Sequence, residues 1–275
     1  MKAPAQIGQL SLAGEDLGTG GTYPPLGFRP VWDAELGNGD YYGLYWPYGR
    51  ESQDPIVCDM LHDEWGMEIA FSGVAIFTDW LQLNEGRRGD VEVEDFALVS
   101  RRYDELKPVL RDQPEEAVAG LRAICDDFPE SAEYWYALAS QLRRIGDHTG
   151  CHAAAVRAFA SNWAFGVPPD GTLRMLQNAK DQTAEPLTAR SGQLTMQYGG
   201  TKENSNYDLL KECIGEYLSS STPVLGLLLN QNYGYMMAME TTAFQDRYGF
   251  DPADWIEEHS QLCAEHLGDS RTQIR

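Results

Sequence analysis

Short runs of aromatic and β-branched residues alternate with turn residues near the start of the chain. Such runs, bounded by glycine, proline, asparagine and aspartate, are typical of strands in an antiparallel sheet. Four strands are expected, over residues 26–36, 41–46, 55–61 and 68–71. Asn38-Gly39 stands between the first two runs, and this dipeptide tolerates the positive φ of a type I′ turn. The first two runs are therefore expected to pair as a hairpin.

The spacing of apolar positions lengthens from two residues to three or four after residue 71. Val74, Phe77 and Leu81 recur at helical spacing, and Ser72 stands where an N-cap would lie. We expect a helix over residues 72–83. Residues 23–98 are thus predicted to be an α+β domain, a small antiparallel sheet closed by one helix.

Apolar positions keep helical spacing almost to the end of the chain, which predicts an all-α domain over residues 99–275. Asp251-Pro252 is the clearest helix start, because an N-cap aspartate precedes a proline at the first helical position. Two segments stand apart. Residues 1–22 are small and glycine-rich and are expected to form a flexible lead-in, and the polar loop over residues 188–205 is expected to be mobile.

A period of 34 residues links two parts of the predicted helical domain. Three apolar positions recur at this spacing: Ala117, Leu121 and Ile124 correspond to Cys151, Ala155 and Ala158. Residues 129–163 resemble a tetratricopeptide repeat. The positions of that pattern are occupied by Trp135, Leu138, Ala139, Leu142, Gly146, Ala155 and Ala158. The preceding unit is a degenerate copy, in which Pro108 is expected to interrupt the helix.

The charge balance narrows the choice of partners. The chain has 42 acidic residues against 21 lysines and arginines, a net charge of −21, and residues 1–98 hold 17 acids and 5 bases, a net charge of −12. Such a chain repels phosphate backbones and anionic lipid surfaces and attracts basic proteins. Direct nucleic-acid binding and membrane contact are therefore not expected. The expected partner is a basic protein.

The cysteines and the apolar runs bear on location. The five cysteines are scattered without CxxC spacing, which is typical of reduced thiols. The longest apolar run, residues 224–229, is too short to span a bilayer, and residues 1–12 lack an apolar signal segment. These features predict a cytoplasmic protein.

The order of motifs over residues 23–84 resembles the SUKH superfamily, the Smi/Knr-like proteins. The resemblance rests on five motifs: Phe28-Arg-Pro-Val-Trp-Asp33, Gly39-Asp40-Tyr-Tyr42, Pro55-Ile-Val57, Ile69-Ala-Phe-Ser72 and Asp79-Trp-Leu81. It implies an α+β fold and an immunity protein, which binds a co-produced bacterial toxin, commonly a nuclease, without catalysing a reaction. An acidic surface suits that role because a nuclease must be cationic to bind phosphate.

The aromatic run over residues 41–48 has two interpretations. Strand alternation would bury Tyr42, Leu44 and Trp46 and expose Tyr41 and Tyr45 as an interface. Alternatively, the tyrosines pack beneath a neighbouring domain. With the first interpretation, the candidate partner-binding residues are Asp33, Glu35, Asp40, Tyr41, Tyr45, Asp54, Asp59, Asp63, Glu64 and Glu68.

The sequence favours a binding protein over an enzyme. It contains no GxSxG, P-loop, HExxH or CxxC motif, and no cofactor is expected. Three clusters offer metal ligands, but solvated turns or helix packing account for each of them: Cys58/Asp59/His62/Asp63/Glu64, His148/Cys151/His152 and His259/Cys263/His266. The leading hypothesis is an immunity protein that occludes a basic toxin, of unknown oligomeric state. The alternative is a helical-repeat adaptor that holds a peptide against residues 99–180.

Overall fold

Four strands form an antiparallel sheet in chain order in the computed structural model of the protein. They are β3 (Phe28–Asp33), β4 (Tyr41–Tyr45), β5 (Ile56–Leu61) and β6 (Gly66–Phe71), in the order β3-β4-β5-β6. The structure describes residues 6–7, 10–11, 22–33, 40–61, 63–86, 89–179, 183–198, 204–269 and 271. All four predicted strands are present.

The predicted hairpin pairing is confirmed. β3 and β4 pair antiparallel with Asp33 opposite Tyr41, while the Asn38-Gly39 turn lies outside the described residues. The predicted lead-in contains two short paired strands, β1 (Gln6–Ile7) and β2 (Leu10–Ser11). Most of residues 1–22 also lie outside the described part of the chain.

One face of the sheet is covered by α1 (Val74–Leu83), as predicted. Phe77 and Trp80 of this helix pack against Tyr42 and Phe71. The prediction that Ser72 caps the helix is wrong, because Gly73 is the N-cap residue and no side chain caps it. The N–H and Oγ of Ser72 instead donate to the Asp95 carboxylate, each at 2.7 Å, since a carboxylate is the stronger acceptor.

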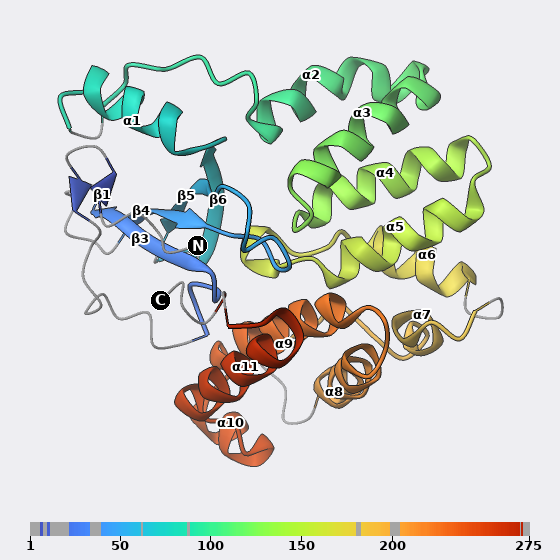
Figure 1. Cartoon of the computed structure of the whole chain (residues 1–275). Helices are drawn as coiled ribbons and strands as arrows, with labels where there is room; N and C mark the ends of the chain where they lie inside the picture. The colour runs from blue at the N-terminus through green and yellow to red at the C-terminus, as the bar shows by residue number, and fades with distance from the viewer. Residues whose placement is uncertain are drawn as a thin grey trace.

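The opposite face of the sheet meets a helical region, which Figure 1 shows on two sides of the sheet. The architecture is therefore α+β. The helices are α2 (Val99–Asp112), α3 (Pro114–Asp127), α4 (Ala132–Arg144), α5 (His148–Ala160), the 3-10 helix η1 (Trp163–Phe165), α6 (Gly171–Ala179), α7 (Pro186–Arg190), α8 (Ser205–Leu218), α9 (Pro223–Ala238), α10 (Thr242–Tyr248) and α11 (Pro252–Leu267).

In the helical region one local expectation fails, one stays a prediction and one is confirmed. α2 continues through Pro108, and Val99 is the one buried residue of this helix. The mobility of residues 188–205 stays a prediction, although Thr188 and Leu194 are buried and α7 lies at the start of this loop. Asp251 caps α11 as predicted, accepting hydrogen bonds from two backbone N–H groups.

A single hydrophobic cluster joins the sheet to the helices. Phe28, Cys58 and Met67 of the sheet belong to the same cluster as the buried faces of α3–α5, α8 and α9. Division of the chain at residues 98 and 99 therefore stays a prediction, because the core crosses that boundary. In the described part of the chain, no helix is both long enough and apolar enough to cross a membrane.

Arg271 connects the segment after α11 to residues 26–51 by hydrogen bonds. Its side chain is 0% exposed and donates hydrogen bonds to the carbonyl oxygens of Leu26 and Trp46 and to Glu51 Oε1, the last at 2.7 Å. Its guanidinium carbon lies 3.4 Å from the centre of the Tyr48 ring. One buried cation thus holds the sheet domain against the segment that follows α11.

Replacement of Arg271 should destabilise the fold far more than replacement of an exposed arginine. Arg271→Met removes the ion pair with Glu51 and the hydrogen bonds to two carbonyls, so the free energy of unfolding should fall by about 3 kcal/mol. Arg101→Met removes an exposed i,i+4 pair with Glu105 and should cost about 0.5 kcal/mol or less. Urea unfolding measures both. Equal losses would contradict the structural role of Arg271.

Candidate partner-binding groove

The junction between the sheet and the helices is organised around one buried carboxylate. Glu130, between α3 and α4, is 1% exposed and accepts three hydrogen bonds. They come from the Tyr45 hydroxyl at 2.5 Å, the Tyr48 backbone N–H at 2.5 Å and the Asn162 side-chain amide at 3.1 Å. Glu130 therefore fixes the end of β4 against the helical region.

The burial of Glu130 and its neighbours changes their pKa values. Burial raises the pKa of Glu130, while Arg271 and the hydrogen bonds oppose that rise. Burial also raises the pKa of Tyr45 and Tyr48, so both phenols stay neutral. Tyr45 is 0% exposed, so the expectation that it is an exposed partner contact is wrong. The reason is that the helices cover this face of β4, as the alternative interpretation of the aromatic run required.

His259 is a second buried member of the junction. Its Nε2 lies 2.7 Å from the Tyr48 hydroxyl, and its Nδ1 lies 2.8 Å from the side-chain amide of Asn230. Burial lowers the pKa of His259 to about 3, with a smaller contribution from Arg271. Both ring nitrogens thus have protein partners, and the imidazole is neutral.

A groove opens beside this junction and is lined by residues of β6, the start of α2 and the start of α4. Figure 1 shows where these elements lie in the fold. We call this groove the junction groove. Its volume is about 340 Å³, and it is lined by Met67, Glu68, Ile69, Ser100, Phe128, Ser131, Glu133, Tyr134 and Phe165. Three lining residues are aromatic, Phe128, Tyr134 and Phe165, and the two charged lining residues, Glu68 and Glu133, are exposed carboxylates. Among the described residues, no lysine or arginine lines the groove.

The negative field of Glu133 reaches the neighbouring tyrosines. Burial, followed by Glu133, raises the pKa of Tyr103 to about 12 and also raises that of Tyr134. The rings of these tyrosines lie 4.8 Å apart. Carboxylates next to aromatic rings suit the ammonium or guanidinium group of a basic side chain.

The structure separates the ten candidate contact residues into groups. Asp40 and Asp59 are buried and Tyr41 is half-buried. Asp33 lies in β3, and Glu35 lies outside the described residues. Four candidates are exposed: Asp54, Asp63, Glu64 and Glu68.

Among the candidates whose side chains are described, only Glu68 lines the junction groove. Glu133, Tyr134 and Phe165 were not among the candidates predicted from the sequence. The approach of α4 and η1 to β6 is a tertiary feature without a local sequence signal, although Glu133 could have been recognised as an exposed acid in the first turn of a predicted helix.

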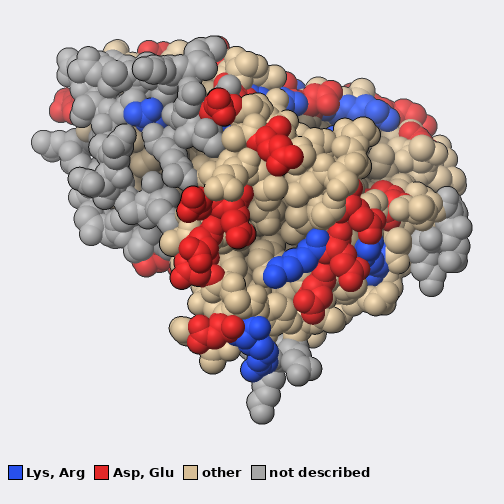
Figure 2. All heavy atoms as spheres, turned by 60° about the horizontal axis from the view of Figure 1, so that its bottom comes forward, with Lys and Arg blue, Asp and Glu red and all other residues tan. Residues whose placement is uncertain are grey.

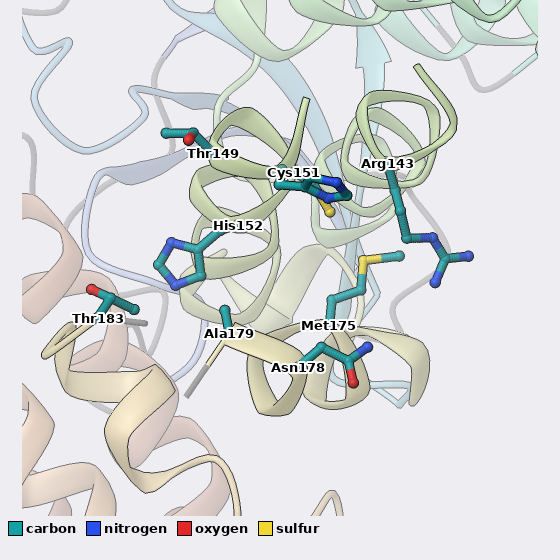
Figure 3. Close-up of a pocket in the computed structure, with 9 residues that line it drawn as sticks. Arg143, Thr149, Cys151, His152, Met175, Asn178, Ala179 and Thr183 are labelled. Carbon is teal, nitrogen blue, oxygen red and sulfur yellow. The ribbon is translucent and has the colours of Figure 1, made fainter. Parts of the chain in front are cut away.

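A larger cavity of about 610 Å³ lies at the turn between α4 and α5 and beside α6. Figure 3 shows Arg143 and His152 at its two sides, with Met175 and Asn178 of α6 between and below them. His152 Nε2 lies 2.7 Å from the hydroxyl of Thr188.

The predicted clusters do not assemble a metal site in the described part of the chain. No group of three or more histidine, cysteine, aspartate or glutamate side chains there is arranged to hold a metal ion. This applies to His148/Cys151/His152 and to His259/Cys263/His266. His62 of the third cluster lies outside the described residues.

Acidic side chains are not confined to the sheet domain. Figure 2 shows several groups of them over one face of the molecule, with basic side chains beside some of these groups. α11 carries Asp254, Glu257, Glu258 and Glu265 and no lysine or arginine. The groove therefore differs from the other acidic surfaces by its concavity and by the aromatic residues in its lining, not by acidity alone.

Burial of neutral His259 should make stability depend on pH. Its folded pKa lies below its ordinary value of 6.5, so its contribution is present above pH 6.5 and is lost as the pH falls toward 3. Between pH 6.0 and 5.0 this group should lower the free energy of unfolding by about 1 kcal/mol. His259→Gln should remove that part of the slope, as measured by urea unfolding. Identical slopes in the two proteins would mean that His259 titrates normally.

Two family models match separate parts of the chain. The model described as YfbP N-terminal domain matches residues 14–90, and the model described as YfbP C-terminal domain matches residues 197–275. A relative from Escherichia coli (strain K12), named "Uncharacterized protein YfbP", is 39% identical over 262 residues, which cover 92% of this chain and 93% of the relative. No solved structure matches the chain. Because the similarity extends over nearly the whole of both proteins, the chain belongs to the YfbP family.

Proposed function

We propose that the chain is a binding protein that holds a basic segment of another protein in the junction groove. The observation that carries the proposal is the composition of the groove. Two exposed carboxylates, Glu68 and Glu133, lie beside aromatic residues, and no basic residue is found among the described residues of the lining. A lysine or arginine side chain would meet opposite charge and ring faces together. The chain acts as a non-catalytic partner in this proposal and needs no cofactor.

Long-range charge supports the same partner. The net charge of −21 attracts a basic protein over roughly 8 Å at physiological salt and speeds its encounter. Aromatic residues and buried apolar surface at the groove would then slow dissociation. An acidic surface also keeps a protein soluble. The position of the acids at the groove, and not their number, is what favours partner binding over solubility alone.

The partner in this proposal is a cognate bacterial toxin, met in the cytoplasm. The resemblance of residues 23–84 to the SUKH superfamily motivates this choice of partner. A toxin that acts on nucleic acid carries a cationic active site, and an acidic groove could occlude it. Its neighbouring gene would encode the toxin, and co-production would restore growth.

A helical-repeat adaptor is the second candidate, and α4 and α5 favour it. These helices form an antiparallel hairpin joined at Gly146, whose φ is +80°, and the repeat positions Leu138, Ala139 and Ala155 are buried. With tetratricopeptide-like repeats, α2 and α4 would be the first helices of successive units. Both contribute to the junction groove, so the adaptor and the immunity protein would share one contact surface.

Charge reversal in the groove should abolish partner capture. The double variant Glu68→Lys with Glu133→Lys is expected to lower affinity at least tenfold, because each reversal replaces an attraction by a repulsion. The matched control is Glu257→Lys with Glu265→Lys on α11, which changes net charge equally. The tagged full-length chain is mixed with native-host lysate at 0.15 M and 0.5 M salt, and bound proteins are identified by mass spectrometry.

Three results would count against the proposal. One is a partner that binds both double variants equally. A second is a captured partner that is acidic, and a third is binding that rises with salt. Capture that depends on the groove, together with rescue of growth by co-production, would support the toxin; capture without rescue would favour the adaptor.

A further inference from the structure

The outer edge of β6 forms one wall of the junction groove. β6 is the last strand of the sheet, and three consecutive residues of it, Met67, Glu68 and Ile69, line the groove. Side chains of a strand alternate between the two faces of a sheet, so a hollow against one face would be lined by every second residue. A lining of consecutive residues places the groove along the strand edge, where Glu68 is exposed, Ile69 is half-buried and Met67 is 4% exposed.

The pairing of β5 with β6 identifies which backbone groups point into the groove. The Tyr23 hydroxyl donates to the carbonyl oxygens of Leu61 and Gly66, at 3.1 Å and 2.5 Å. Leu61 and Gly66 lie opposite each other in the ladder. One hydroxyl can reach both of their carbonyl oxygens only if each carbonyl points toward the other strand, which is the arrangement of a hydrogen-bonded pair. Alternation along the ladder then directs the N–H and C=O groups of Met67 and Ile69 away from β5.

The neighbouring η1 turn packs against β6 without pairing with it. The N–H groups of Phe165 and Gly166 donate within the turn, while that of Trp163 donates to Asn232. Among the described residues, no hydrogen bond from another element reaches the backbone of Met67 or Ile69. Within the described part of the chain, the outward N–H and C=O groups of Met67 and Ile69 are thus without a backbone partner from another element.

We infer that the junction groove binds its partner by strand addition: an extended, basic segment of another protein pairs with the outer edge of β6 and extends the sheet. The inference rests on the proposed function and adds the conformation of the bound segment. Main-chain hydrogen bonds to Met67 and Ile69 would supply affinity, and the carboxylates of Glu68 and Glu133 would select lysine or arginine.

Charge argues against a second copy of this chain as the occupant. Pairing of two β6 edges would bring Glu68 of each copy close to the same residue of the other, in two molecules that each carry a net charge of −21. Like charges at such close range are destabilising. A basic segment removes this repulsion, and a charged residue in the middle of an open edge is also how sheets resist pairing with themselves.

The test uses the ¹⁵N-labelled full-length chain and a capped heptapeptide of alternating lysine and valine. Before addition, the amides of Met67 and Ile69 should exchange with deuterium faster than the amide of Glu68, which faces β5. The peptide should slow exchange at Met67 and Ile69 at least tenfold. A control peptide with the same sequence and charge, but N-methylated at alternate residues, should bind at least tenfold more weakly because it lacks the donors that pair with β6.

Two variants complete the experiment. Ile69→Pro removes the outward N–H and should weaken the heptapeptide at least tenfold, with circular dichroism as the check on folding. Glu68→Lys should weaken both peptides, whereas Glu257→Lys on α11 should weaken neither. The N-methylated peptide keeps the test decisive even if Ile69→Pro does not fold.

Each other outcome overturns strand addition in a distinguishable way. If the two peptides bind equally and Glu68→Lys weakens both, the acidic contact would be supported and strand addition would be rejected. Binding of neither peptide, while the groove variants still govern capture from lysate, would do the same. A concentration-dependent dimer that protects Met67 and Ile69 would make a second copy the occupant.

Discussion

The carboxylate of Glu130 is the interaction on which the arrangement of sheet and helices depends. An isolated buried charge is costly, and it is tolerated here because hydrogen bonds and the nearby Arg271 compensate for lost hydration. The donors come from β4, from the segment after it and from the residue before η1. Because these donors come from three parts of the chain, their hydrogen bonds to Glu130 hold β4, the segment after it and the start of η1 in fixed positions relative to one another. The junction groove is the space that remains beside this fixed contact.

Much of the local structure could be predicted from the sequence because it depends on short-range patterns. The Asn38-Gly39 dipeptide, the aromatic strands and the Asp251-Pro252 helix start act over a few residues, and the expected pairing and capping are present. The errors arose where a tertiary partner overrode a local preference. Ser72 bonds to Asp95 instead of capping α1, and the helices cover Tyr45 on the face where strand alternation alone would have exposed it.

The candidate site was less predictable than the fold, for a related reason. Glu68 could be identified as an exposed acid on a strand, but its relation to Glu133 depends on how α4 docks against β6, and these residues are far apart in sequence. Charge totals pointed to residues 1–98, whereas the groove draws its acids from both sides of that limit. The two family models leave residues 91–196 unmatched, so the helical wall of the groove lies between them. Variation in that wall would change the partner without changing the sheet.

The buried position of Arg271 has a consequence for folding during synthesis of the chain. Its ion-pair partner Glu51 precedes it by 220 residues. At the usual speed of a ribosome, roughly 10–45 s separate the synthesis of the two residues. Throughout that interval Glu51 lacks its ion-pair partner. Helices α1 to α11 are all synthesised before Arg271, so this contact can form only after the elements that pack against the sheet have been made.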